Sequence, residues 1–467
     1  MKQNPTAVPA SRRSEPEVTD SAERAGQGAL DFNFYYSSAT EGDLSTLLGA
    51  PHYSYRFAEA KFLSMFKERR VPLNKLSMPE YYNTPQALPE AIHRAGARDM
   101  HLMFRSTEQF RLLKFAWNVC CFAWEFDVIK DHTDINEHPF LNQKRMLALC
   151  DDIWVPCLYT KSVLEAHGLR HVHVVPAPIA PVPHDAPPVL ESLARLGHLS
   201  VAPLDYNFLR SQAQNRAACG ERVSTFLEYI GARIKACKKL RIYLTILNPE
   251  DFRKNLDASL RAFDHFSRRR KDAVLVVKVL TAASRFHLLD VLCDVIPNKM
   301  ASGAVFQSDN IVFFNDFLSE SELSSLYGIA DYYLCTSLCE GQNLPLLEAM
   351  AHGVVPVTTA NTAMSDYISP ENAVVIQGHR ELNDCMHLAG TIAQRPFYVQ
   401  RSRAADIHDA LERSFRLTRA RYAALSKQAR EVTRAKFAPE VVWQAMAARL
   451  AAIAPLAAAK GPKASRP

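Results

Sequence analysis

Short apolar runs alternate with longer amphipathic segments along most of this chain, and this alternation constrains the fold more than any other feature. Apolar runs bounded by turn residues predict buried strands, and the amphipathic segments predict helices. In the first half the predicted strands are residues 31–37, 99–105, 115–124, 151–156 and 171–176, and the predicted helices are 58–70, 143–150 and 160–168, the last closed by Gly168. This order indicates an α/β fold with a mostly parallel sheet covered on both faces.

The same alternation resumes after a proline-rich stretch, PAPIAPVPHDAPP, which begins at Pro176. Predicted strands follow at 241–247, 273–280, 310–317, 331–337 and 353–359, and predicted helices at 221–239, 255–270, 321–330 and 344–353. Two similar α/β domains predict a cleft between them. The carboxyl edge of each sheet should face this cleft, where open α/β sheets bind ligands.

The expected organisation has five parts. They are a disordered tail at 1–28, a first domain at 29–180, a linker or insertion at 181–239, a second domain at 240–435, and a C-terminal helix and tail at 436–467. The apolar residues of the last segment repeat at helical spacing: Val441, Trp443, Met446, Leu450 and Ile453. This pattern predicts a helix that packs back on the body of the protein.

Charge and hydropathy exclude several classes. No long uninterrupted apolar run occurs and the N-terminus is polar, so neither a membrane span nor Sec-type export is expected. Lys+Arg is 55 against Asp+Glu 49, and this diffuse net charge of +6 does not indicate a nucleic-acid partner. The ten cysteines form no C-x-x-C pair and lie mostly in apolar runs, which is typical of reduced thiols in the cytoplasm.

Glycine is scarce, with 16 in 467 residues. Neither G-x-G-x-x-G nor G-x-x-x-x-G-K-[ST] occurs, which excludes the glycine-rich phosphate loops. The phosphates of a nucleotide would have to be bound in another way, and the segment around Glu340 and Gly341 offers one. There a predicted strand is followed by a short loop and by a helix with Asn343 as its N-cap and Pro345 in its first turn. The N–H groups and the positive dipole end of that helix form an anion site at the cleft.

Two carboxylates, Glu340 and Glu348, accompany this anion site. Carboxylates repel phosphate, but they accept hydrogen bonds from the hydroxyls of a sugar or a ribose. Arg253 and Lys254 follow the strand at 241–247 and offer cations at the same sheet edge. The alternative interpretation of this basic pair is a solvated helix start, and for Glu348 it is an acid favoured by the helix dipole.

These residues resemble the GT-B glycosyltransferases of the large retaining family 4 type, "glycosyl transferases group 1". EGQNLPLLEAMAHGVVPV carries that family's E-x(7)-E element as Glu340 and Glu348, and RKNLDASLRAF is similar to its phosphate-contacting region. FAWEFD, at 122–127, resembles the first domain of members with a "WE" element. The resemblance implies the GT-B architecture, two Rossmann-like domains facing a cleft.

The resemblance also implies a Leloir-type activity. A hexose-type sugar would move from a nucleoside diphosphate sugar to a glycan, lipid-linked or other acceptor, with retention of configuration, no metal and no further cofactor. The implied catalytic residues are Glu340 on the donor sugar and Lys254 and Arg253 on the diphosphate, and the implied donor-binding residues are Glu348 on the ribose with Gly341, Gln342, Asn343 and Leu344. The family's usual upstream Gly-Arg pair is absent from LTILNPEDF, and Arg253 is the candidate replacement.

The acceptor side and the activity class leave alternatives open. Glu125 either contacts the acceptor or packs with Trp124 into the domain interface, and His132 either faces the acceptor or lies on the surface. A nucleotide-sugar epimerase, a phosphorylase or a non-catalytic sugar-nucleotide-binding subunit would fit the same architecture. The basic runs at 238–241 and 268–271 are expected to be solvated helix ends, with attraction to an anionic membrane as the alternative. The expected location is the cytoplasm, with peripheral contact at the inner face of the membrane as a variant.

Overall fold

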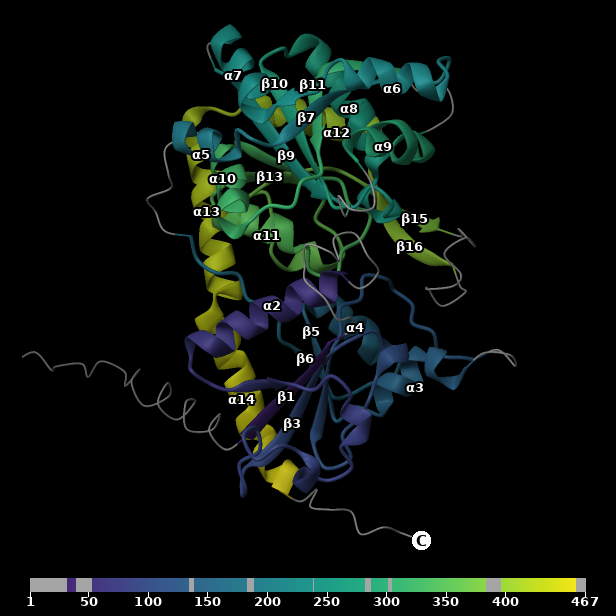
Figure 1. The fold of residues 1–467 in the computed structure, drawn as a ribbon, viewed down its shortest axis with the longest axis vertical. Helices are drawn as coiled ribbons and strands as arrows, with labels where there is room; N and C mark the ends of the chain where they lie inside the picture. Colours follow the sequence, from purple (N-terminus) through teal and green to yellow (C-terminus); the bar gives the residue numbers. More distant parts are fainter. Residues whose placement is uncertain are drawn as a thin grey trace, which may run out of the picture.

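The computed structural model describes residues 32–38, 53–133, 138–182, 189–237, 239–281, 287–300, 305–383 and 396–458. The tail expected at 1–28 and the last residues, 459–467, lie outside the described residues. The described chain forms two α/β domains, which stand one above the other in Figure 1. The two-domain architecture predicted from the sequence is therefore confirmed.

The first domain is built on a parallel sheet of six strands in the order β2-β1-β3-β4-β5-β6. Its strands are β1 Phe32–Ser38, β2 Leu73–Lys75, β3 Arg98–Phe104, β4 Trp117–Cys121, β5 Asp152–Val155 and β6 Val172–Val174, and its helices are α2 Tyr53–Glu68, α3 Gln143–Ala148 and α4 Leu158–Ala166. Strand β2 was not predicted, because three residues of sequence LNK carry no apolar run.

The second domain contains an eight-stranded sheet in the order β14-β13-β12-β9-β10-β11-β7-β8. Its strands are β7 Ser200–Asn207, β8 Ser224–Thr225, β9 Arg241–Leu247, β10 Ala273–Val279, β11 Val305–Phe314, β12 Tyr332–Cys335, β13 Val355–Thr358 and β14 Val374–Val375. Its helices are α5 Val189–Leu196, α6 Gln212–Gly220, α7 Phe226–Ala236, α8 Leu256–Arg269, α9 Leu288–Asp290, α10 Glu320–Ile329 and α11 Leu344–Ala351, with the single turn η5 at Phe252–Lys254. Every residue of β10 is buried, as expected for a central strand covered on both faces.

The segment expected as a linker or insertion, 181–239, contributes α5, β7, α6, β8 and α7 in its described part. Strand β7 pairs antiparallel with β11 and so extends the sheet of the second domain. The predicted helix at 221–239 begins only at Phe226, because Thr225 caps it in a capping box with Glu228. These residues therefore complete the second domain rather than merely connect the two.

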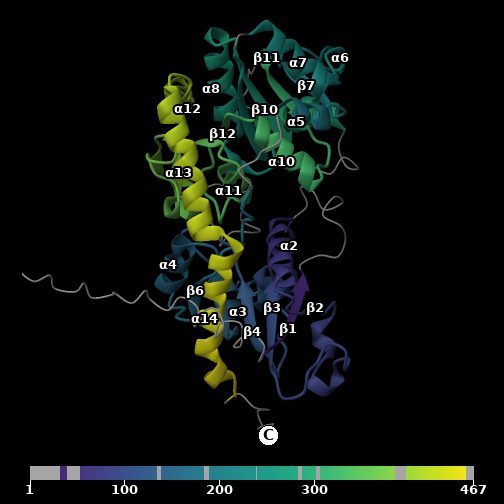
Figure 2. The same cartoon turned by 90° about the vertical axis from the view of Figure 1, so that its left-hand side faces the viewer.

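Three consecutive helices close the chain on the outside of both domains. They are α12 Ala404–Phe415, α13 Arg419–Phe437 and α14 Pro439–Ala458, preceded by a small antiparallel sheet of β15 His379–Asn383 and β16 Phe397–Arg401. Helix α13 lies beside the second domain, and α14 continues onto the first, as the yellow ribbon in Figure 2 shows. Trp443 packs edge-on against Phe66 of α2, with 5.5 Å between ring centroids. The predicted packing of the last helix on the body is confirmed.

Candidate functional site at the interdomain cleft

A cavity of about 1430 Å³ lies between the domains and is lined by both. The first domain contributes helix α2 and the loop after β4. The second contributes the carboxyl ends of β9 and β10, η5, α10 and the start of α11. Pockets for a single small ligand usually measure about 300–1,000 Å³, so this cavity has room for more than one small ligand.

Helix α11 begins at the cavity as predicted. Asn343 is its N-cap in the left-handed conformation, with φ of 64°, and its side chain accepts a hydrogen bond from the backbone N–H of Leu346 at 3.4 Å. Asparagine tolerates this conformation better than most residues. Both Asn343 and Leu344 line the cavity. The first turn of α11 thus presents the positive end of its dipole to the cleft.

Glu340 and Lys254 meet at this helix start. The Glu340 carboxylate accepts hydrogen bonds from the Lys254 ammonium and from the Ser337 hydroxyl, each at 2.6 Å. Burial by itself would lower the pKa of Lys254, but Glu340 and Asp251 outweigh burial and raise it. Lys254 therefore stays charged at neutral pH and provides a fixed cation beside a buried carboxylate.

Arg253 lies between two carboxylates of different domains. Its guanidinium donates to Asp251 through Nε at 2.8 Å and Nη2 at 2.5 Å, and its Nη1 pairs with Glu125 of the first domain. Burial opposes the charge of Arg253, but the two acids prevail and raise its pKa. Arg253 and Lys254 are mostly buried and paired, so the interpretation of a solvated helix start is wrong. The sequence analysis missed Asp251, although an N-cap acid before the basic pair is a local signal.

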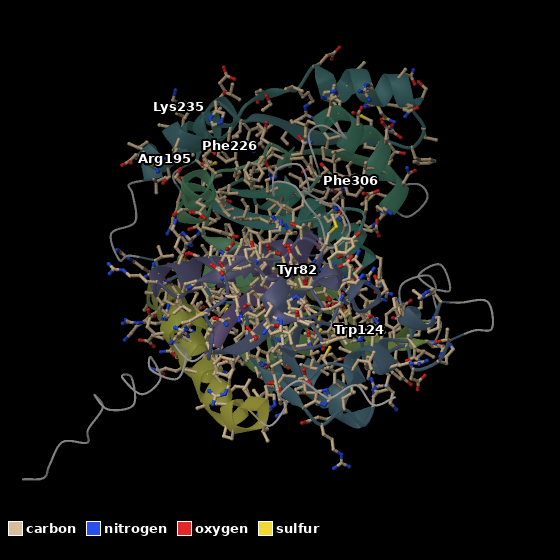
Figure 3. All side chains as sticks on the ribbon, turned by 60° about the horizontal axis from the view of Figure 1, so that its bottom comes forward. Tyr82, Trp124, Arg195, Phe226, Lys235 and Phe306 are labelled. Atoms are coloured by element: carbon tan, nitrogen blue, oxygen red, sulfur yellow. The ribbon has the colours of Figure 1, made fainter. Side chains whose placement is uncertain are left out.

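The "WE" segment packs against the loop that carries Gly341. Trp124 is buried and stacks on Phe122, with ring centroids 5.5 Å apart, and Figure 3 shows it within the first domain. Glu125 lines the cavity, and burial raises the pKa of its carboxyl despite the neighbouring Arg253. A Cβ added to Gly341 would come within 3.4 Å of Glu125 Oε2. Both residues of this segment therefore line the cavity, Trp124 as a buried, stacked ring and Glu125 as a carboxylate.

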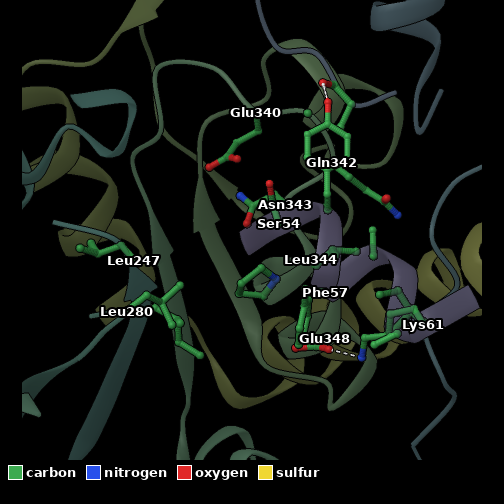
Figure 4. Close-up of a pocket in the computed structure, with 18 of the residues that line it drawn as sticks. Ser54, Phe57, Lys61, Leu247, Leu280, Glu340, Gln342, Asn343, Leu344 and Glu348 are labelled. Atoms are coloured by element: carbon green, nitrogen blue, oxygen red, sulfur yellow. Dashed lines mark hydrogen bonds and ion pairs between the residues drawn. The ribbon is translucent and has the colours of Figure 1, made fainter. Parts of the chain in front are cut away.

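Glu348 and Gln342 both contact the first domain. Lys61 of α2 forms an ion pair with Glu348 across the cleft, drawn in Figure 4, and Tyr327 donates to the same carboxylate at 3.1 Å. The Gln342 amide donates to the carbonyl of Ala177 at 2.9 Å and accepts from the N–H of Ala177 at 3.1 Å. The sequence analysis found neither Lys61 nor Ala177 as a partner, because no local pattern links segments so far apart in the chain.

His132 does not line the cavity. Its side chain is 34% exposed and its Nδ1 lies 3.5 Å from Asp131, so of the two alternatives for His132 the geometry favours the surface. Across the described ranges, no group of three or more His, Cys, Asp or Glu side chains could hold a metal ion. None of the helices in the described part of the chain is long and apolar enough to cross a membrane.

Lys278, near the end of β10, is a cavity residue that the sequence analysis did not single out. Its side chain is 3% exposed, and its ammonium donates to the carbonyl of Val279 at 3.0 Å and lies 5.6 Å from the ring centroid of Phe314. Burial lowers its pKa to about 7, against the opposing charge of Asp316. The signal for it was a single lysine inside the apolar run AVLVVKVL.

The burial of Lys278 predicts a pH dependence of stability. An unfolded lysine titrates near about 10.4, so between pH 7 and 10 the unfolded state binds more protons than the folded state. Unfolding free energy should therefore rise with pH through this window, by about 1.4 kcal/mol per pH unit relative to Lys278→Met. Urea unfolding of both proteins at pH 7, 8 and 9 measures this difference. A constant difference would show that Lys278 is not desolvated as described.

Part of the chain is similar to a known protein family, and the fold is similar to solved structures. Residues 241–387 match the family model described as "Glycosyl transferases group 1". No curated protein matches the chain. Among solved structures, Anabaena Alr3699/HepE in complex with UDP and glucose is similar at 10% identity and a TM-score of 0.50, over 90% of this chain and 99% of that one.

Longer proteins match with lower scores. The S. aureus TarM structure matches at 11% identity and a TM-score of 0.47, over 75% of this chain and 55% of TarM. The trehalose 6-phosphate synthase of Burkholderia multivorans matches at 12% identity and a TM-score of 0.49, over 99% of this chain and 89% of that one. This chain therefore spans little more than half the length of TarM.

Proposed function

We propose that this chain, whose residues 241–387 match the glycosyl transferases group 1 family model, moves a hexose-type sugar from a nucleoside diphosphate sugar to an acceptor. The transfer would retain the anomeric configuration of the sugar and would need no metal ion. The observation that carries it is the buried pair of Lys254 and Glu340, which stands at the N-terminus of α11 in a cleft lined by both domains. This arrangement combines cations for a diphosphate with carboxylates for hydroxyls.

The donor diphosphate would lie in front of α11, with Lys254 and Arg253 beside it. When the bond between the sugar and the diphosphate breaks, negative charge develops on the leaving phosphate, and fixed cations stabilise that charge. Because Lys254 is paired with Glu340 without a ligand, donor binding would exchange this contact. The ammonium would turn to phosphate, and the Glu340 carboxylate would accept hydroxyls of the sugar.

The remaining cleft residues would serve the ribose and the acceptor. Glu348 would exchange Lys61 for the ribose hydroxyls, and Glu125 would face the acceptor across the loop of Gly341. The acceptor would be a glycan, a lipid-linked sugar or a related hydroxyl compound. The nine cysteines described here are free thiols, which supports a cytoplasmic location, and contact with the inner membrane face would suit a lipid-linked acceptor.

Release of nucleoside diphosphate tests this function. The structure of HepE was obtained with UDP and glucose, so UDP-glucose is the first donor to try, followed by other uridine and guanosine diphosphate sugars. Glu340→Gln should lower release by about one to two orders of magnitude, because a charged hydrogen bond to the sugar is lost. Glu431→Gln, on the exposed surface of α13, is the matched control and should keep full activity.

The outcomes separate the activity classes. Equal release by the wild type and Glu340→Gln would remove Glu340 from the mechanism. Isomerised sugar nucleotide without transfer would indicate an epimerase instead. Tight binding of donors without any turnover, tested with a panel of glycan acceptors, would indicate a binding subunit.

A further inference from the structure

Lys278 occupies an apolar part of the cleft, and no carboxylate among the described residues forms an ion pair with it; the charge of Asp316 acts on it only from a longer distance. In the sheet register it is level with Ile246 of β9 and Phe314 of β11. Within the described residues its ammonium makes no ion pair, and its hydrogen bond goes to the carbonyl of the next residue, Val279. Since an ammonium can donate three hydrogen bonds, this group has unused donors in a cavity that binds a ligand under the proposed function.

The ligand group opposite Lys278 should be a neutral acceptor, because apolar side chains flank this lysine: Ile246 and Phe314 are its neighbours in the sheet, and its ammonium lies 5.6 Å from the Phe314 ring centroid. A counter-ion for phosphate has to be charged at working pH, as Lys254 is. Burial instead holds the pKa of Lys278 at about 7, so a large part of this lysine is uncharged at neutral pH. The amine form and the ammonium form of lysine both donate hydrogen bonds. An uncharged carbonyl oxygen can therefore accept a hydrogen bond from Lys278 in either protonation state.

The position of Lys278 separates it from the sugar and diphosphate residues. In the sheet order, β9 lies between β10 and β12, the strand that leads to Glu340. Two strand spacings amount to roughly 10 Å, so a ligand that reaches both Glu340 and Lys278 must be extended across the strand ends.

The walls near Lys278 are apolar. Ile246 and Phe314, the register neighbours of Lys278, belong with Leu318 to one buried apolar cluster, and Leu280 packs against it. Ile246, Leu280 and Leu318 line the cavity, and Figure 4 shows Leu280 on the side away from Lys61 and Glu348. Apolar walls with a single oriented donor suit a flat heteroaromatic ring. They do not suit a polyhydroxylated sugar, which needs many polar partners.

We propose that Lys278 is a specificity-determining residue that donates a hydrogen bond to a ring carbonyl oxygen of the donor's nucleobase. This inference rests on the proposed function. Uracil and guanine carry a ring carbonyl, and adenine carries none, so the chain should bind uridine or guanosine diphosphate more tightly than adenosine diphosphate. A site that hydrogen-bonds a ligand group discriminates against a ligand without it, because the buried donor then stays unpaired.

Binding of the free nucleotides tests this assignment. Dissociation constants for UDP, GDP, ADP and inorganic pyrophosphate are measured by calorimetry on the full chain and on Lys278→Met, whose side chain has a similar length and no donor. We expect the better of UDP and GDP to bind at least tenfold more weakly to Lys278→Met, with ADP and pyrophosphate changed less than twofold. Lys254→Met is the contrasting variant and should weaken all four ligands.

Three other results would each contradict the role proposed for Lys278. Equal weakening of all four ligands by Lys278→Met would make Lys278 a phosphate-binding residue. Unchanged affinities would place it outside the nucleotide site. A wild type that binds none of the four would overturn the proposed function together with this inference. Lys278→Leu is a second variant without a hydrogen-bond donor at this position. A thermal melt of each variant shows which of them is folded, and the binding result is taken from a folded one.

Discussion

Replacing Lys254 with methionine should lower kcat with a sugar nucleotide donor by about two to three orders of magnitude, the usual effect of losing one preorganised stabiliser of transition-state charge. Lys254 is mostly buried, and its pKa is raised by Glu340 and Asp251 against the effect of burial, so its charge is fixed before the ligand arrives. The variant also leaves Glu340 without its cation. Steady-state kinetics with UDP-sugars and calorimetry with UDP measure the two effects.

A lysine far from the cleft provides the control for this experiment. Lys427 on α13 is 73% exposed, and its one ion pair among the described residues is with Glu431 of its own helix, so Lys427→Met should keep the activity of the wild type. Lys254→Arg keeps the charge but changes its shape, and it should fall between the two. A kcat of Lys254→Met within threefold of the wild type would refute the role assigned to this cation.

Replacing Arg449 with methionine should reduce the free energy of unfolding by about 3–5 kcal/mol, the cost of removing one partner of a buried ion pair. Arg449 of α14 donates to both oxygens of Asp152 on β5, at 2.7 and 2.8 Å, and the Asp152 side chain is fully buried. Without the guanidinium, the partners left to this carboxylate in the described part of the chain are the side chains of Trp154 and His173. Urea unfolding monitored by tryptophan fluorescence measures the loss.

Two further variants isolate the buried charge as the cause. Arg416→Met removes an exposed guanidinium from Glu412 of α12, which keeps Arg270 as a partner, and should cost at most about 1 kcal/mol. The double variant Asp152→Asn with Arg449→Met removes both charges, and it should recover part of the stability lost in Arg449→Met alone. If the two arginine variants lose equal stability, α14 is not anchored through this pair.

The predictions that succeeded depended on short stretches of sequence. Buried apolar runs predicted the strands around β9, β10 and β12, and a polar residue two positions before a proline predicted the N-cap Asn343. The meeting of Lys254 and Glu340 followed from topology, because parallel strands that neighbour one another end at the same edge. These inferences needed only the period of the pattern and the direction of the strands.

Contacts between the domains could not be predicted in this way. The pairs of Arg253 with Glu125 and of Lys61 with Glu348 join segments far apart in the chain, and their formation depends on how one domain is rotated against the other. The pairing of β7 with β11 likewise escaped notice, because an antiparallel edge strand after a proline-rich stretch has no signature of its own. Such contacts are set by the packing of whole surfaces.

The sequence alone thus determined the two α/β domains, the helix start that replaces a glycine-rich phosphate loop, and the carboxylates and cations at one sheet edge. Only the tertiary structure decided which cation each carboxylate holds, that Glu125 reaches the second domain, and that Lys278 lies in the cleft without an ion pair to any described residue. The physical reason is the range of the interactions. Hydrogen-bond periodicity and helix capping act over a few residues, whereas burial and charge pairing depend on every segment that folds against the group.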